Sequence, residues 1–254
     1  MQPSSDIAAI RKLLASDSLD VNRDVLPDDP MHLYNPELYF QAGSDALKRI
    51  RLALVAAERD SVSTILDFAC GGGRVLRYLR AEFPEASITA TDLYVAGLAF
   101  CAEAFSARPV AGQLNLDDLE LEGPFDLIWV GSLFTHLGSD DWDRLLGMFQ
   151  ETLSPRGVLV FTVYGRTIVE ALRQGRETLD LKDEHVQEIV REYDEAGFGF
   201  FPDLNPEVNH GDAVASRSWV CSKLDTFPQL QLVLYTEAAW LAQDVIACVK
   251  AAES

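Results

Sequence analysis

Three consecutive glycines, Gly71 to Gly73, lie between a short apolar segment and a helical pattern. Glycine lets the backbone turn tightly and approach a bound molecule, and the amide groups that open the next helix attract negative ligand groups. Asp92 ends the next apolar segment, where a carboxylate can accept hydrogen bonds from both hydroxyls of a ribose. Together these features predict a nucleotide-like ligand. The simpler alternatives are a tight turn without a ligand and a helix cap at Asp92.

The spacing of the glycines disfavours one class of ligand. Nicotinamide enzymes usually show Gly-x-Gly-x-x-Gly, and Leu76 stands here three residues after Gly73. An NAD-dependent oxidoreductase is therefore the weakest functional alternative. A cofactor-binding protein without catalysis, acting as a regulatory subunit, would keep both the glycine turn and Asp92.

Short apolar segments alternate with helical patterns through the middle of the chain. The predicted strands are 64–68, 87–91, 110–114, 126–130 and 158–163, and the predicted helices are 74–82, 95–107 and 139–153. Such alternation is typical of a parallel sheet with helices on both faces. The carboxyl ends of parallel strands meet at one edge, so the glycine turn, Asp92 and the turn at Gly131 and Ser132 should converge on a crevice there.

The helix predicted from Ser139 has the strongest pattern. Ser139 is expected to cap it, and two acids follow in its first turn, where the helix dipole favours negative charge. Its apolar stripe consists of Trp142, Leu145, Leu146, Phe149 and Leu153.

The alternation stops after residue 163. Residues 164–212 hold two helical stretches and a loop, and we expect them to form a cap over the site. A helix should begin near Ser216, and two final strands are predicted at about 230–235 and 244–250. The link between these strands is too short for a helical crossover, so they should pair antiparallel.

The amino-terminal part is predicted to be helical. Ile7, Ile10, Leu13 and Leu14 have helical spacing within 5–16, and a polar surface connection follows. A second helix should begin near Ser44. We therefore expect a helical extension and lid over 1–60 and a ligand-binding core over 61–254.

Composition excludes several classes of protein. The 254 residues are 48% hydrophobic and 24% charged, as in an ordinary globular protein. Four cysteines and four histidines lie far apart, which argues against zinc ligation and a disulfide framework. The net charge of −19 disfavours nucleic acid and membrane partners. No targeting segment or membrane-spanning run is visible, so a cytoplasmic location is expected. The oligomeric state stays open, a homodimer included.

The segment 64–77 resembles the first motif of class I S-adenosylmethionine-dependent methyltransferases. That motif is an acid followed by alternating glycines, here Asp67, Ala69, Gly71 and Gly73, with alanine replacing the first glycine. Three further stretches resemble the family in the same order: ThrAlaThrAspLeu at 89–93, GlyProPheAspLeuIleTrpValGlySerLeuPheThrHisLeu at 123–137 and LeuSerProArgGlyValLeuValPhe at 153–161. The resemblance covers residues 64–164.

The resemblance implies a Rossmann-like, mostly parallel seven-stranded sheet of order 3-2-1-4-5-7-6 with an antiparallel last pair. It implies S-adenosylmethionine as cofactor, S-adenosylhomocysteine as product and no metal. The segment from Asp67 to Gly73 would receive the methionine moiety, Asp92 the ribose and Leu93 one face of the adenine. The remaining cofactor residues would be Gly131 and Ser132, with Asn115 and Leu116 at the adenine edge. Gln113 is the competitor there, and Asn115 bonding its own backbone is an equal alternative.

The expected reaction is methyl transfer to a small-molecule acceptor, for which we predict a hydroxyl of a sugar or secondary metabolite. The methyl group of the cofactor is already activated, so positioning governs the reaction and a base is needed only for hydroxyl-like acceptors. His136 is the candidate base, and packing against the cofactor loop is its alternative role. Candidate residues of the acceptor pocket are Tyr34, Tyr39, Tyr164, Arg166 and His210.

Overall fold

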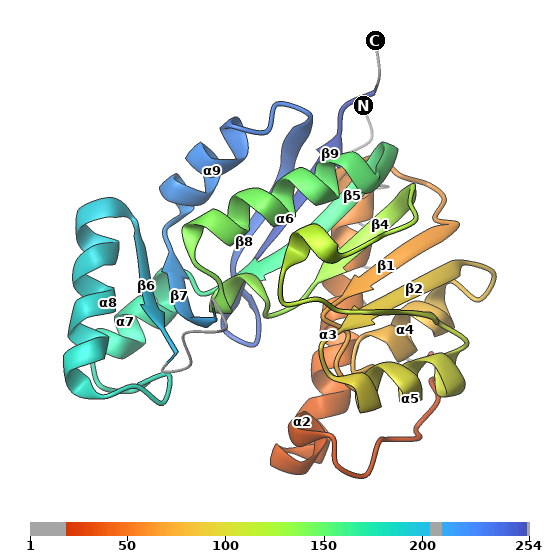
Figure 1. Cartoon of the computed structure of the whole chain (residues 1–254), viewed down its shortest axis with the longest axis horizontal. Coiled ribbons are helices and arrows are strands. Elements are labelled where there is room, and N and C mark those ends of the chain that lie inside the picture. The colour runs from red at the N-terminus through yellow and green to blue at the C-terminus, as the bar shows by residue number, and fades with distance from the viewer. Residues whose placement is uncertain (1–18, 204–209, 253–254) are drawn as a thin grey trace, which may run out of the picture.

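The computed structural model describes residues 19–203 and 210–252. A seven-stranded sheet forms its centre, in the order β3-β2-β1-β4-β5-β9-β8 (Figure 1). The strands are β1 (Thr64–Phe68), β2 (Ser87–Asp92), β3 (Arg108–Ala111), β4 (Phe125–Val130), β5 (Leu153–Val163), β8 (Leu230–Trp240) and β9 (Gln243–Lys250). The first five are parallel, and β9 pairs antiparallel with both β5 and β8. The predicted sheet order and reversed last pair are confirmed.

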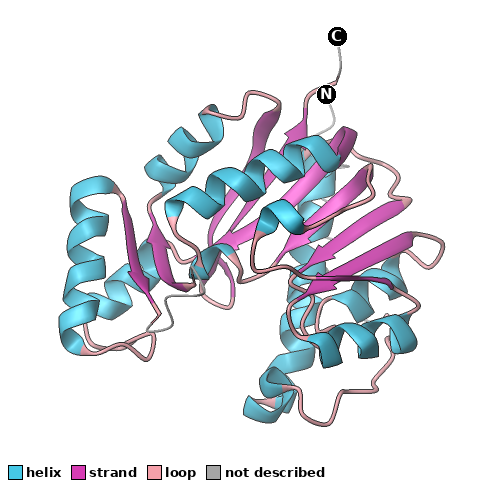
Figure 2. Cartoon of the chain, viewed as in Figure 1, coloured by secondary structure: helices cyan, strands magenta, loops and turns pink. Residues whose placement is uncertain are grey.

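Helices cover both faces of this sheet (Figure 2). On one face lie α3 (Pro36–Ala56), α4 (Leu76–Glu82) and α5 (Val95–Phe105). On the other face lie α6 (Ser139–Thr152) and α9 (Arg217–Asp225). Neighbouring strand residues alternate between the two apolar cores: Ile65 packs in the first and Leu66 in the second. At the centre of the sheet, where both faces are buried, strand β4 is apolar apart from Asp126 and shows no polar alternation, as the sequence pattern indicated.

Two predicted details near the crevice are wrong. The third strand runs over Arg108–Ala111 rather than 110–114, and the last contact with β2 is the Gly112 N–H on the carbonyl of Asp92 at 2.9 Å. The N-cap residue of α6 is Gly138, whose backbone is extended (φ −68°, ψ 161°), and Ser139 is the first residue of the helix. The Ser139 hydroxyl instead accepts a hydrogen bond from Lys223. The rest of that helix is confirmed, with Trp142, Leu145, Leu146 and Phe149 of the apolar stripe buried. The last predicted stripe residue, Leu153, lies beyond the helix and begins β5.

The amino-terminal helix of the core begins earlier than predicted, at Pro36 rather than near Ser44. It follows the short helix α2 (Pro30–Tyr34). Each helix begins with an Asp-Pro or Asn-Pro pair, in which the carboxylate of Asp29 or the amide of Asn35 caps the first turn. The Asp29 signal lies in the run that the sequence analysis assigned to a connection, and the Asn35 signal follows that run. The helix predicted at 5–16 lies outside the described residues.

Residues 166–203 and 210–215 form a module beside the sheet, at the left in Figure 1. It contains α7 (Arg166–Arg173) and α8 (Asp183–Ala196), which match the two predicted helices. It also contains a hairpin, β6 (Phe198–Pro202) and β7 (Gly211–Ala215), that the sequence analysis missed. Isolated bridges join Leu137 to His210 and Tyr164 to Val214, so the module touches the core at the carboxyl ends of β4 and β5.

Two short 3₁₀ helices complete the crevice, η1 (Leu116–Asp118) after β3 and η2 (Phe134–His136) after β4. Within the described ranges, none of the helices has the length and apolar character needed to span a membrane.

Candidate functional site

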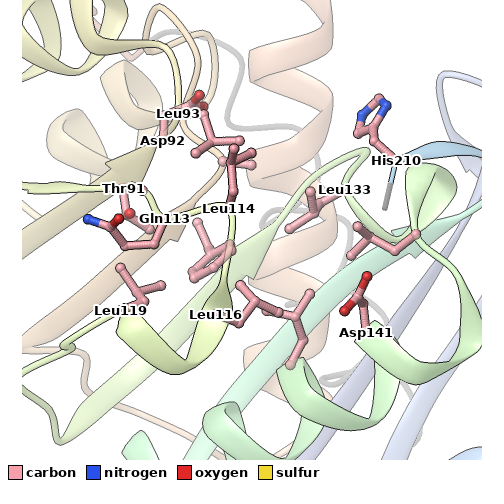
Figure 3. A pocket seen from close by; sticks show the side chains of 15 residues that line it. Thr91, Asp92, Leu93, Gln113, Leu114, Leu116, Leu119, Leu133, Asp141 and His210 are labelled. Carbon is pink, nitrogen blue, oxygen red and sulfur yellow. The ribbon is translucent and has the colours of Figure 1, made fainter. Parts of the chain in front are cut away.

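Two cavities lie at the carboxyl ends of the parallel strands. The first has a volume of about 250 Å³ and is lined by residues after β1 to β4, among them Asp92, Leu93, Gln113, Leu116, Leu133, Asp141 and His210 (Figure 3). The second, of about 240 Å³, is lined by residues of the glycine turn and its surroundings, among them Tyr39, Asp67, Gly71, Arg74, Ser132 and Trp240. Ala69 lines both cavities, so it lies where they adjoin.

The glycine turn has three residues in the left-handed region: Ala69 at φ 63°, Gly71 at 54° and Gly73 at 78°. A Cβ added at Gly71 would meet no atom within 4 Å, whereas one at Gly73 would lie 2.4 Å from the ring of Phe105. Gly71 therefore leaves open space on the cavity side, and Gly73 permits close helix packing. Ala69 adopts a conformation that glycine tolerates better.

The carboxylate of Asp67 is the most unusual group of the second cavity. Its side chain is 1% exposed, and Oδ2 has no hydrogen-bond partner among the described residues. Burial, and then the charge of Asp92, raise the pKa of Asp67 to about 8. A buried acceptor without a partner is costly, and a ligand that donates a hydrogen bond or carries a positive charge would remove that cost.

Arg74 brings a cation to the same cavity. Its guanidinium carbon lies 5.1 Å from the ring centre of Trp240, and burial lowers the pKa of Arg74. An acid and a base in one small cavity suit a zwitterion, whose ammonium would face Asp67 and whose carboxylate would face Arg74. The sequence analysis missed Arg74 although it follows the glycines directly. It also missed Trp240, which lies far away along the chain.

Asp92 carries backbone hydrogen bonds of its own. Its Oδ2 accepts the N–H of Gly71 at 2.7 Å, and its Oδ1 accepts the N–H of Tyr94 at 2.8 Å. Asp92 therefore does cap the backbone locally, which was the alternative role considered for it. Each carboxylate oxygen can accept a second hydrogen bond, so the ribose role is compatible with these contacts. Leu93 beside it is 53% exposed and lines the first cavity, which suits contact with a flat ring.

At the expected adenine edge, the geometry favours Gln113 over Asn115. Asn115 caps η1: its Oδ1 accepts the N–H of Asp117, and its Nδ2 donates to Asp118. It does not line the first cavity, whereas Gln113 and Leu116 do (Figure 3).

The turn after β4 is held by buried side chains. Gly131 and Ser132 line the second cavity, and Ser132 has a φ of 58°. The Ser132 N–H donates to Oγ1 of Thr162, and Gln243 donates to the Ser132 hydroxyl at 2.6 Å. Thr162 in turn donates to Gln243 at 2.6 Å. These partners, on β5 and β9, have no signal near the turn in sequence, and they fix a strained residue beside the cavity.

Two imidazoles stack near the first cavity. His136 and His210 have ring centres 4.7 Å apart and planes 11° apart. Nδ1 of His136 is 2.9 Å from the carbonyl oxygen of Gly211, which can only accept, so Nδ1 carries the proton and Nε2 is the acceptor of the neutral ring. Burial lowers the pKa of His136. His210, not His136, lines the first cavity.

The other predicted acceptor residues do not gather at one place. Tyr39 is buried at the second cavity and donates to Asp29 at 2.8 Å. Tyr34 is 84% exposed and lines neither cavity. Tyr164 lies 6.5 Å from His136, ring centre to ring centre, and burial raises the pKa of Tyr164 to about 12. Arg166 is exposed and pairs with Glu237 at 2.6 Å.

A fully buried arginine, Arg77, is hydrogen-bonded to the glycine turn. Arg77 is 1% exposed, and its Nε donates to the carbonyl of Gly73 at 3.0 Å. Its Nη1 donates to the carbonyls of Asn22 and Asp24, each at 2.9 Å. One cation thus joins the amino-terminal segment to the turn. Over the described ranges, no group of three or more histidine, cysteine or acidic side chains is placed to hold a metal ion.

A comparison with protein families finds a methyltransferase domain over residues 66–159. Among curated proteins, a malonyl-[acyl-carrier protein] O-methyltransferase of Acetivibrio thermocellus is 27% identical over 115 residues, which cover 45% of this chain and 40% of that protein. The chain spans less than half the length of the curated relatives that it matches.

Solved structures share the fold. An S-adenosylmethionine-dependent methyltransferase from Clostridium acetobutylicum has a TM-score of 0.59 and 18% identity, with 87% of this chain and 96% of that chain covered. An amino pentose methyltransferase from Micromonospora echinaspora, solved with its S-adenosylmethionine bound, has a TM-score of 0.57 and 15% identity, with 90% and 99% covered. These likenesses extend beyond residues 66–159 to most of the chain.

Proposed function

We propose that this chain, which carries a class I S-adenosylmethionine-dependent methyltransferase domain, binds that cofactor across the two cavities and transfers its methyl group to a hydroxyl of a small molecule. The observation that carries the proposal is the buried Asp67 carboxylate with its unpartnered Oδ2, beside Arg74 and the open space at Gly71. An amino acid moiety would supply an ammonium for Asp67 and a carboxylate for Arg74, and it would occupy the open space at Gly71. A nicotinamide cofactor has no ammonium to offer Asp67.

The residues present fit the whole cofactor. Asp67 would hold its ammonium and Arg74 its carboxylate, Asp92 would accept from the ribose hydroxyls, and the adenine would lie against Leu93 and Gln113. The two cavities adjoin at Ala69, and each is smaller than the roughly 300–1,000 Å³ usual for a small-molecule or cofactor site. Together they suit a ligand with a nucleoside end and an amino acid end.

The bound cofactor supplies an activated methyl group, and the residues of the chain have to position the acceptor and take its proton. A hydroxyl acceptor needs a base, and the stacked imidazoles of His136 and His210 are the groups available near the first cavity. His136 is the base that the sequence indicates. Its Nδ1–H is fixed by Gly211, which leaves Nε2 as the proton acceptor.

A small molecule is the favoured acceptor on two grounds. The net charge of −19 opposes nucleic acid and anionic lipid surfaces. The amino pentose methyltransferase of similar fold acts on a sugar-like molecule, as its name states. We infer the same general class here, a sugar or secondary metabolite, in a cytoplasmic setting.

Calorimetric titration with S-adenosylhomocysteine, S-adenosylmethionine and NAD tests the proposal. The two S-adenosyl compounds should bind at one site, and NAD should not compete. Tight NAD binding with no S-adenosylhomocysteine binding would overturn the assignment. Binding without methylation of any acceptor in a broad panel of alcohols, phenols and amines would favour the non-catalytic alternative.

A further inference from the structure

The first cavity has two chemically different ends. At one end lie Asp92 and Gln113, where the ribose and adenine are proposed to bind. At the other end lie His210 and Asp141, separated from the first group in Figure 3. Leu133 lies on the side of these two polar residues, whereas Leu119 lies near Gln113 (Figure 3). The cavity is lined by further leucines: Leu116, Leu137 and Leu145. Nothing in the proposed cofactor contacts uses this second end.

We infer that this end is the acceptor subsite, that it takes an apolar ring compound presenting a hydroxyl and rejects carboxylates, and that His210 receives the proton of that hydroxyl. The inference rests on the proposed function and narrows its substrate class from a sugar or secondary metabolite to a secondary metabolite with an apolar ring.

The charges of the cavity explain why an anion is rejected. Among the described residues that line it, the ionisable side chains are Asp92, Asp141 and His210, so no lysine or arginine faces the ligand. Asp141 is 8% exposed and pairs with Arg144 at 3.6 Å, and Arg144 does not line the cavity. A second carboxylate placed among leucines beside Asp141 would be desolvated and repelled. The subsite therefore does not suit the malonyl carboxylate in the names of the curated relatives.

Asp141 also has a positive role. It lies in the first turn of α6, where the helix dipole stabilises its charge. A carboxylate there can accept a hydrogen bond from a polar hydrogen of the acceptor, such as a second hydroxyl. The leucines supply apolar contact for the ring. Asp141 would bind the polar edge of a ring compound while the leucines contact its apolar faces, and together these contacts would fix its orientation.

His210 is better placed than His136 to take the proton, because it lines the cavity while His136 stacks behind it. Among the described residues, the charged or titratable groups that act on His210 are His136 on η2, Asp203 after β6 and Asp212 on β7. Burial, and then the neighbouring His136, lower the pKa of His210, and the two acids oppose this in part. A neutral imidazole near pH 7 is ready to accept a proton. His136, held by Gly211, is then a positioning residue.

The step balances without further reactants. The oxygen–hydrogen bond of the acceptor breaks and its proton passes to His210, while the oxygen forms a bond to the methyl carbon. The bond between sulfur and methyl breaks with its electron pair staying on sulfur. The charged His210 then releases the proton to water.

Binding of matched probes to protein saturated with S-adenosylhomocysteine tests the substrate class. We expect 2-naphthol to bind about tenfold or more tightly than 2-naphthoate in calorimetry, because only the latter is anionic. Asp141→Asn should reduce this preference to a few fold, and the control Asp140→Asn, an exposed neighbour in the same turn, should leave it unchanged. Equal binding of both probes, or no binding of 2-naphthol, overturns the inference.

The proton acceptor is tested by methylation of 2-naphthol against pH. His210→Gln should lower the maximal rate by about 100-fold or more and remove its fall at low pH, with affinity for S-adenosylhomocysteine nearly unchanged. His136→Gln should lower the rate less and keep the low-pH limb. The reverse ranking, or a His210→Gln rate within a few fold of wild type at every pH, overturns the role of His210, as does absence of methylation by the wild type.

The two levels of proposal fail in different ways. If S-adenosylhomocysteine does not bind the wild-type protein, the proposed function fails. If it binds normally and 2-naphthoate is accepted as well as 2-naphthol, only the acceptor inference fails.

Discussion

The carboxylate of Asp92 accepts the backbone N–H of Gly71 at 2.7 Å, which joins the end of β2 to the open glycine of the turn after β1. The residue proposed to hold the ribose therefore also fixes the turn proposed to hold the methionine moiety. A substitution at either residue should therefore weaken the contacts of both the ribose and the methionine moiety.

Asp92→Ala should weaken binding of S-adenosylhomocysteine by at least about tenfold. The substitution removes two charge-assisted hydrogen bonds to the ribose, each about 1.5–3 kcal/mol before water compensates, and releases the Gly71 amide. Asp92→Asn keeps an acceptor and should lose less. Calorimetry measures both variants, and circular dichroism checks the fold. Wild-type affinity in a folded Asp92→Ala variant would contradict the ribose assignment.

Gly71→Val should abolish cofactor binding while much of the sheet stays folded. A branched side chain would occupy the open space at Gly71 and resist its φ of 54°. Gly175→Val is the matched control, because Gly175 has a φ of 62° and equally open surroundings in the connection after α7. The two variants should lose similar stability in urea unfolding, and only the first should lose binding. If both bind normally, the turn is purely structural.

Affinity for S-adenosylhomocysteine should rise with pH between about 6 and 8. Asp67 has a pKa of about 8 in the free protein, so below that pH its carboxyl must give up a proton before it can pair with the ligand ammonium. The slope should approach tenfold per pH unit well below the pKa. Calorimetry in buffers of different ionisation heat counts the released proton. Asp67→Asn should bind weakly with no such slope, and a flat wild-type profile would argue against ammonium pairing.

The same carboxyl should make the free protein less stable as pH rises. Its folded pKa of about 8 lies above the unfolded value of about 4, so the folded state holds one more proton between these limits. The contribution of Asp67 to the free energy of unfolding is therefore greatest below pH about 4, and it decreases as the pH rises to about 8. Urea unfolding of the wild type and Asp67→Asn should show the variant gaining relative stability from pH 5 to 8. A constant difference would refute the raised pKa.

Ala69→Gly should stabilise the protein. Ala69 has a φ of 63°, which costs a residue with a Cβ about 1–2 kcal/mol, and the greater freedom of glycine in the unfolded chain offsets part of the gain. We expect a rise in melting temperature of about 1–3 °C. Ala46→Gly, in the middle of α3, should lower it. A loss of stability at Ala69 would indicate that its methyl group packs favourably despite the strain.

The sequence was sufficient to predict the helices and strands that show a clear apolar periodicity or a family motif. The sheet order, the stripe of α6 and the antiparallel last strands follow from apolar periodicity, loop length and family motifs. It was not sufficient where a residue depends on a distant partner. Nothing near Ser132 signals Gln243, and nothing near the glycines signals Trp240.

The histidines illustrate the same limit within the site. His136 follows the fourth strand and so stands out in sequence, whereas His210 belongs to a hairpin that periodicity did not reveal. Only the folding of that hairpin onto η2 places His210 at the cavity. The local signals at Asp29 and Asn35, by contrast, were readable, because an acid or amide before proline commonly starts a helix.

The position of Arg77 sets a limit on how this protein can be shortened. A chain that starts at residue 61, the predicted border of the core, would keep the whole glycine motif and all of its strands. It would lack the carbonyls of Asn22 and Asp24, and the buried guanidinium of Arg77 would lose these two hydrogen-bond acceptors while it stays bonded to Gly73. The smallest unit able to hold a ligand is therefore larger than the recognisable motif, and it includes the segment that carries Asn22 and Asp24.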